Sequence, residues 1–214
     1  MASLGARIFP SLRRRIGELR TSPLRAEIAR QIRVLDASGM SLLSNNCVAG
    51  ILYEWAGLPK QTPTAGVYFA GPAYEQFLGD LATDCLDRWT SFTPSSLIYK
   101  QAQQCWALPG PTGGELVFLH YPDAAVAVEK WSRRLDRLRG RTPLVFTSIR
   151  DSIDPESLAT VLADFRMTFT VVGSPAPPAD ELVLDRRVLA RFSGYLGDAL
   201  AAGADRRAAD EMLI

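Results

Sequence analysis

The stretch 42–53 constrains the fold more than any other part of the chain. It begins as a short apolar run, crosses a polar turn and continues with apolar residues at helical spacing; the turn reads Ser44, Asn45, Asn46 and Cys47. Because this pattern is typical of a strand, a tight turn and a helix, we expect a strand over 40–43 and a helix over 48–55. Cys47 would then lie at the start of that helix, where backbone N–H groups and the helix dipole favour a thiolate.

Strand and helix patterns alternate along the rest of the chain. Helices are expected to follow most of the apolar runs, and the runs that predict strands cover 65–69, 115–120, 142–149 and 167–172, with two short strands near 96–99 and 104–108. Strands that alternate with helices predict an α/β fold in which a mostly parallel sheet is covered by helices on both faces.

We expect a single α/β domain over residues 23–202. The chain has 214 residues and 47% hydrophobic content, enough for one sizeable core. Residues 1–22 are rich in arginine and predict a basic N-terminal arm, either solvated or a helix packed on its own domain, with an amphipathic helix on an anionic membrane surface as the alternative. Pro23 suits the first turn of the next helix, and residues 203–214 predict a flexible tail.

The composition indicates the cellular location of the protein and limits the classes of partner that it could have. The three cysteines form no CxxC pair, which disfavours a disulfide framework and a structural zinc site and favours a reducing, cytoplasmic location; we expect Cys85 and Cys105 in the core. No run reaches the roughly 18 to 20 apolar residues of a membrane span, and the start has no uninterrupted apolar region typical of a signal peptide. A net charge of +1 gives no indication of a nucleic-acid partner.

Polar residues follow three of the expected strands. They are the turn 44–47, the pair His120 and Tyr121, and the run Ser148-Ile149-Arg150-Asp151. Ligands of open α/β sheets bind beyond the carboxyl ends of the strands. If the strands are parallel, all three groups lie along one rim and form a candidate site.

These residue types suit nucleophilic catalysis. Cys47 is the candidate nucleophile, His120 is the only histidine and therefore the candidate base, and Asp151 is the candidate residue that orients the imidazole. Asn45, Asn46 and the N–H groups after Cys47 could stabilise an oxyanion, and Arg150 could bind a phosphate or carboxylate.

Each feature also has a structural interpretation. Cys47 could be inert packing, His120 a structural hydrogen-bonding residue, the two asparagines a turn and helix cap, and Arg150 with Asp151 a surface ion pair. The helix after Pro122 carries basic residues that we expect on a solvated outer face, with a polyanion-binding patch as the alternative; they are Lys130, Arg133, Arg134, Arg137 and Arg139. Neither a phosphate-binding glycine loop nor a metal-ligand spacing is present.

A set of motifs in fixed order resembles one family. They are Ser44-Asn45-Asn46-Cys47, Gly50, Leu58-Pro59, Thr62-Pro63-Thr64, Phe118-Leu119-His120-Tyr121, Lys130-Trp131-Ser132-Arg133-Arg134 and Arg150-Asp151. In these residues, over about 41–172, the chain resembles the uncharacterised bacterial family called domain of unknown function 1919. The family's Ser-Asn-Asn-Cys motif falls on 44–47 and its His-Tyr pair on 120–121. Val48-Ala49 departs from the family's usual aromatic residue followed by glycine, so a shared substrate contact is not carried over.

The resemblance implies a three-layer α/β/α sandwich and a role in capsule or exopolysaccharide biosynthesis, with which family members are often linked. A looser likeness is to polysaccharide-modifying acyltransferases. The first hypothesis is therefore acyl transfer to a sugar or glycan through Cys47, His120 and Asp151, with an acyl-coenzyme A as a conceivable donor and no metal. The expected substrate-binding residues are Ser44, Asn45, Asn46, Tyr121 and Arg150.

Two alternatives use the same residues. One is a non-catalytic protein that binds a carbohydrate or a carrier lipid, in which Tyr53, Trp55 and Tyr121 stack on sugars and the basic start contacts a membrane or a partner. The other is a thiol hydrolase of the Cys-His type. Thiol reactivity separates binding from catalysis, because only catalysis needs an activated Cys47.

Overall fold

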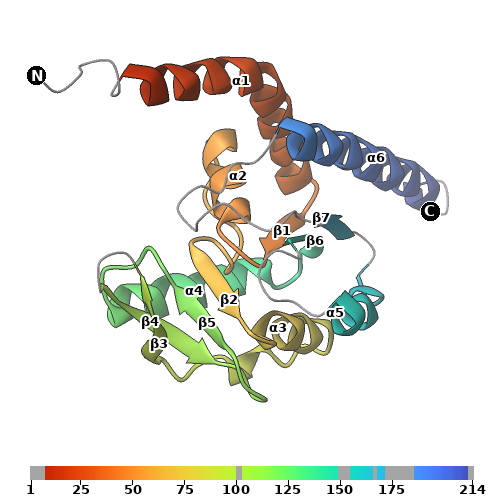
Figure 1. Ribbon diagram of the computed structural model, residues 1–214. Helices are drawn as coiled ribbons and strands as arrows, with labels where there is room; N and C mark the ends of the chain where they lie inside the picture. The colour runs from red at the N-terminus through yellow and green to blue at the C-terminus, as the bar shows by residue number, and fades with distance from the viewer. Residues whose placement is uncertain (1–7, 100–102, 149–154, 166–167, 172–185, 212–214) are drawn as a thin grey trace, which may run out of the picture.

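The structure is a computed structural model that describes residues 8–99, 103–148, 155–165, 168–171 and 186–211 (Figure 1). Its elements are α1 (Ile8–Ala37), β1 (Met40–Ser44), α2 (Val48–Ala56), β2 (Val67–Ala70), α3 (Ala73–Ala82), the short 3₁₀ helix η2 (Leu86–Arg88), β3 (Thr93–Tyr99), β4 (Gln103–Pro109), β5 (Glu115–Phe118), α4 (Ala124–Leu138), β6 (Thr142–Ser148), α5 (Pro155–Leu162), β7 (Thr168–Val171) and α6 (Arg186–Glu211). The predicted strand–turn–helix at 40–55 is confirmed as β1 and α2.

The strands form two sheets. One is parallel, with the order β1-β6-β7, and the other is antiparallel, with the order β2-β5-β4-β3. The fold is therefore mixed α/β, and the expected parallel pairing is wrong for the segment 67–118. Only residues 110–114 join β4 to β5. Parallel strands need a crossover of a dozen or more residues, so this short turn permits only antiparallel pairing.

Side chains of the parallel sheet alternate between two hydrophobic cores. Leu42 and Phe146 face the core formed with α1, α2 and α6, while Leu43 and Val145 face the core formed with α3 and α5. This follows from the alternation of side chains along a strand. Figure 1 shows α1 and α6 side by side on one side of this sheet, with the antiparallel sheet at a distance from both helices.

Helix α4 packs against the antiparallel sheet through aromatic side chains. The ring centroids of Phe118 on β5 and Trp131 on α4 are 5.8 Å apart. The indole Nε1 of Trp131 donates to the carbonyl of Trp89 at 2.9 Å. This packing fixes the position of α4 relative to the residues that follow β5.

The outer helices differ from the predicted boundaries. Helix α1 begins at Ile8 and passes through Pro23, so it includes residues that the sequence assigned to an arm. Figure 1 shows the helix changing direction along its length, and an internal proline is a common cause of such a bend. Helix α6 continues to Glu211, past the predicted end of the domain. Within the described residues, no helix is long and apolar enough to cross a membrane.

The two remaining cysteines occupy different environments. Cys105 on β4 is buried, as expected. Cys85 is only partly buried, because α3 ends at Ala82 and the chain turns at Asp84, whose φ is positive. The expectation of a core position is therefore wrong for Cys85.

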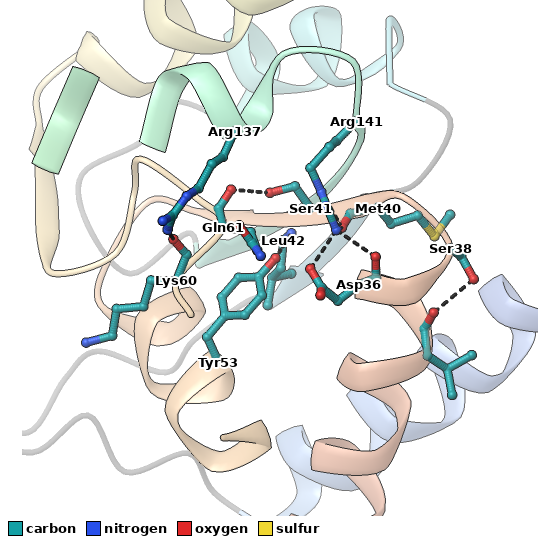
Figure 2. Close-up of polar contacts among 11 residues, drawn as sticks. Asp36, Ser38, Met40, Ser41, Leu42, Tyr53, Lys60, Gln61, Arg137 and Arg141 are labelled. Atoms are coloured by element: carbon teal, nitrogen blue, oxygen red, sulfur yellow. Dashed lines mark hydrogen bonds and ion pairs between the residues drawn. The ribbon is translucent and has the colours of Figure 1, made fainter. Parts of the chain in front are cut away.

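Side chains complete the outer edge of β1, whose only strand neighbour in the described structure is β6. The backbone N–H of Leu42 donates to the hydroxyl of Tyr53 at 3.2 Å, and that of Ser44 donates to Thr64 Oγ1 at 3.1 Å. Ser41 Oγ donates to the carbonyl of Gln61 at 3.0 Å. Figure 2 shows Tyr53 reaching from α2 to β1 and Ser41 facing Gln61. The segment after α2 is thus held along the edge of β1.

The start of β1 is fixed by an arginine (Figure 2). Arg141 Nη2 donates to Asp36 Oδ1 at 2.6 Å and to the carbonyl of Met40 at 2.7 Å. Both partners are partly buried, which makes the ion pair less exposed to screening than a surface pair. The contact joins the end of α1, the start of β1 and the start of β6.

We predict that Tyr53→Phe destabilises the fold by about 1–3 kcal/mol, since it leaves the buried N–H of Leu42 without its acceptor. Urea denaturation of the purified chain measures this. Ser38→Ala is the matched control, because that hydroxyl makes an exposed bond to the carbonyl of Val34, and it should change stability by less than about 0.5 kcal/mol. Equal effects of the two changes would contradict the role of Tyr53.

Candidate functional site

Cys47 and His120 meet although 73 positions separate them in the sequence. Cys47 Sγ lies 3.5 Å from His120 Nε2. Cys47 is the N-cap of α2 and is partly buried, whereas His120 follows the end of β5 and is exposed. The expected convergence of the only histidine on this thiol is therefore present in the structure.

The two residues meet for a different reason from the one the sequence suggested. The backbone N–H of Phe69 on β2 donates to the carbonyl of Asn45 at 3.3 Å, and that of Leu119 donates to the carbonyl of Gly66 at 3.2 Å. The carbonyl of Val67 also lies 3.8 Å from Cys47 Sγ. The site therefore lies where the turn after β1, the start of β2 and the end of β5 meet, and not along the rim of one parallel sheet.

Hydrogen bonds between nearby residues stabilise the turn before Cys47. Ser44 Oγ donates to the carbonyl of Asn46 at 2.6 Å and accepts from the N–H of Ala49 at 3.0 Å. Asn46 Oδ1 accepts from the N–H of Val48 at 3.1 Å. The first two N–H groups of α2, which we expected to stabilise an oxyanion, are thus already engaged as caps. The side chains of Ser44, Asn45 and Asn46 are buried, so a direct contact with substrate would require this turn to open.

Tyr121 lies inside the site, and its side chain is only 6% exposed. Its hydroxyl donates to the carbonyl of Ala65 at 2.7 Å and accepts from Arg134 Nη1. Burial raises the pKa of Tyr121, the positive charge and the hydrogen bond of Arg134 oppose that rise, and the negative charge of Cys47 adds to it. The phenol therefore stays protonated near neutral pH and acts as a hydrogen-bond donor.

Arg134 corrects one prediction made from the sequence. It was expected on the solvated outer face of α4, but it is only 8% exposed and its Nη1 also donates to the carbonyl of Ala65 at 2.9 Å. The spacing contained a signal for this position. Arg134 lies three residues after Trp131 and four before Leu138, both buried, and these intervals place residues on one helix face.

Two glycines permit the close approach of α2 and the start of β2. Gly66 has a φ of +79°, a conformation that residues with a Cβ rarely adopt. A Cβ at Gly50 would lie 3.3 Å from Cα and 3.3 Å from Cβ of Ala65. Gly50 therefore sets the distance between the helix that carries Cys47 and the segment that carries Gly66.

Other expected site residues lie elsewhere. Arg150 and Asp151 are outside the described residues, so their roles stay predictions. Tyr53 is buried and so cannot stack on a sugar, and the Arg25 guanidinium, 4.8 Å from the ring centroid of Trp55, covers one face of that ring. Among the residues that the structure describes, no group of three or more His, Cys, Asp or Glu side chains is placed to hold a metal ion.

A family model matches a large part of the chain. The model of a family described as Domain of unknown function (DUF1919) matches residues 22–163. The matched range contains Cys47, His120 and Arg134, and it leaves α6 outside. No curated protein matches the chain.

We predict that Gly50→Ala costs about 1–3 kcal/mol through overpacking against Ala65, which outweighs the better helix propensity of alanine. It should also slow the alkylation of Cys47, because α2 must shift. Gly79→Ala is the matched control in α3, where a Cβ meets nothing within 4 Å, and it should stabilise by about 0.5–1 kcal/mol. Denaturation and alkylation rates measure both variants, and a stabilising Gly50→Ala would show that the approach is not tight.

Proposed function

The chain belongs to the family Domain of unknown function (DUF1919), and from that premise we propose that it is a cysteine-dependent acyltransferase that acts on a sugar or glycan. The observation that carries the proposal is the 3.5 Å separation of Cys47 Sγ and His120 Nε2. A thiol within reach of an imidazole at a helix start is the arrangement that generates a nucleophilic thiolate.

The reaction has two steps. Nε2 of His120 takes the proton of Cys47, Sγ attacks the carbonyl carbon of the donor, and the bond to the leaving group breaks as His120 returns the proton to that group. A hydroxyl of the acceptor then gives its proton to His120 and attacks the thioester. The C–S bond breaks, and the proton passes from His120 back to the sulfur, which regenerates the thiol.

The surroundings of the sulfur favour its anionic form. Cys47 is the N-cap of α2, so the positive end of the helix dipole lies beside it. The buried guanidinium of Arg134 is joined to the same region through Tyr121 and the carbonyl of Ala65. Both features act at low solvent exposure, where electrostatic interactions are stronger than in water.

The proposal extends to the biological context that the family resemblance suggests. The acceptor would be a sugar of a bacterial exopolysaccharide or capsule, and the donor an acyl-coenzyme A. Asp151 would orient the imidazole of His120, and Arg150 would bind a phosphate or carboxylate. The reaction would take place in the cytoplasm, with the arginines of residues 1–22 as a contact to the membrane surface.

The geometry supports catalysis better than sugar or carrier-lipid binding alone. Of the three aromatic residues expected to stack on sugars, Tyr53 and Tyr121 are buried and Trp55 is covered on one face by Arg25. A binding protein also has no need for an imidazole beside a thiol. The Cys-His pair serves equally for hydrolysis, which differs only in that water replaces the acceptor hydroxyl.

We predict that iodoacetamide alkylates Cys47 faster than Cys85 at neutral pH, and that His120→Ala slows the reaction of Cys47 about tenfold by reducing its thiolate fraction. Peptide mapping by mass spectrometry reports both thiols in one sample. Cys85 is the internal control, since it is also partly buried but has no histidine beside it in the described structure. Equal rates at the two thiols would favour a binding protein.

We predict that p-nitrophenyl acetate, a general acetyl donor, leaves one acetyl group on Cys47 that hydroxylamine removes. The adduct should form on the wild-type chain and on Cys85→Ser, and it should be absent from Cys47→Ser. Intact-mass measurement detects it. Acetyl-coenzyme A, tested in the same way, examines the proposed donor separately. No adduct from either donor on a folded chain would rule out Cys47 as the nucleophile.

A further inference from the structure

The basic residues of α4 and its C-cap Arg139 differ in their partners, and one of them, Arg137, donates to the carbonyl of Lys60. On the outer face, Arg133 pairs with Glu129, and Arg139 pairs with Asp87 at 2.8 Å and with Asp136. Lys130 and Arg134 point the other way. Among the described residues, neither has a carboxylate within ion-pair distance, although acidic side chains lie on the same helix.

These two cations converge on one ring. Lys130 Nζ lies 5.5 Å and Arg134 Cζ lies 5.9 Å from the ring centroid of Tyr121. Residues four positions apart lie on the same helix face, so the two like charges repel each other. A cation–π contact attracts each of them but neutralises neither.

Burial makes this arrangement costly. Arg134 is only 8% exposed, and its contacts are neutral groups, the carbonyl of Ala65 and the hydroxyl of Tyr121. A buried charge is destabilising unless a counter-charge compensates it. Lys130 is half-buried beside it and adds a second positive charge. The two side chains therefore create a positive region that no described side chain balances.

The positive region adjoins the reactive pair. Tyr121 follows His120 directly, and its hydroxyl shares the carbonyl of Ala65 with Arg134. Two residues further on, the carbonyl of Val67 contacts Cys47 Sγ. The charge of Cys47 also contributes to the raised pKa of Tyr121, after the larger effect of burial. A ligand at Cys47 thus lies within the field of both cations.

We propose that Lys130 and Arg134 form an anion subsite that binds a carboxylate or phosphate group of the substrate while its acyl carbon lies at Cys47. This inference rests on the proposed function and names its substrate class: an anionic acyl compound, not a neutral ester. The ammonium of Lys130 provides a point charge, and the guanidinium of Arg134 provides directional N–H donors, which together suit an oxyanion.

The test compares an anionic and a neutral alkylating reagent on the full chain. The ratio of the iodoacetate rate to the iodoacetamide rate is measured at Cys47 and, in the same sample, at Cys85, which lies between Asp84 and Asp87 in the sequence. Constant ionic strength keeps screening equal. We expect the ratio at Cys47 to exceed that at Cys85 about tenfold, a factor that corresponds to about 1.4 kcal/mol.

The variants Lys130→Gln and Arg133→Gln form a matched pair on α4. Lys130→Gln should lower the ratio at Cys47 toward that of Cys85, and Arg133→Gln, which removes an exposed and paired charge, should leave it unchanged. Lys130 is the preferred target because the buried hydrogen bonds of Arg134 make its replacement a risk to folding. Equal ratios at Cys47 and Cys85, or equal effects of the two variants, overturn the proposal.

Inorganic phosphate and acetate, added at the same ionic strength, separate the two anion classes. Protection of Cys47 against iodoacetate by one of them identifies the substrate group, and protection by neither overturns the subsite. The outcome for the proposed function is separate. If Cys47 reacts fast with iodoacetamide in a way that depends on His120, but the rate ratio is equal at Cys47 and Cys85, the proposal of Cys47 as nucleophile stands. Only the proposal of an anion subsite is then overturned.

Discussion

Hydrogen bonds from the segment 62–69 reach both sheets, and the candidate site exists because of them. On one side Thr64 Oγ1 accepts from Ser44, and Phe69 donates to the carbonyl of Asn45. On the other side the carbonyl of Gly66 accepts from Leu119. Buried backbone groups must be paired, so this segment cannot move away from either neighbour without loss. It therefore holds the turn that carries Cys47 at one edge of β2 and the end of β5 at the other edge. From these positions Cys47 Sγ and His120 Nε2 lie 3.5 Å apart.

The same segment organises the charges. The carbonyl of Ala65 accepts from Arg134 and from Tyr121, so a buried guanidinium is held close to the reactive pair. Such a charge is tolerated because its N–H groups find acceptors, yet its positive field remains. The hydrogen bonds that stabilise the junction therefore also hold a positive charge near Cys47, and the proposed thiolate and anion subsite depend on that charge.

The local sequence pattern predicted most of the strands and helices, but it did not predict how all of the strands pair. The turn 44–47 and the helix after it were predictable, because a strand, a polar turn and a helix each leave a distinct period in the sequence. The antiparallel pairing of β4 with β5 was also accessible, since the turn 110–114 is too short for a crossover. The burial of Arg134 was not predicted. Its charge indicated a solvated position, although its spacing from Trp131 and Leu138 places it on the buried face of α4.

By itself, the sequence determined which residue types are available for chemistry and where most of the strands lie, because these depend on residue type and on neighbours a few positions away. Cys47 and His120 both lie within the range that matches the family. Only the tertiary structure decided that the thiol and the imidazole meet across β2, that Ser44 and Asn46 cap α2, and that two cations face Tyr121. Those outcomes depend on hydrogen bonds and packing between segments far apart in the chain, which no local period encodes.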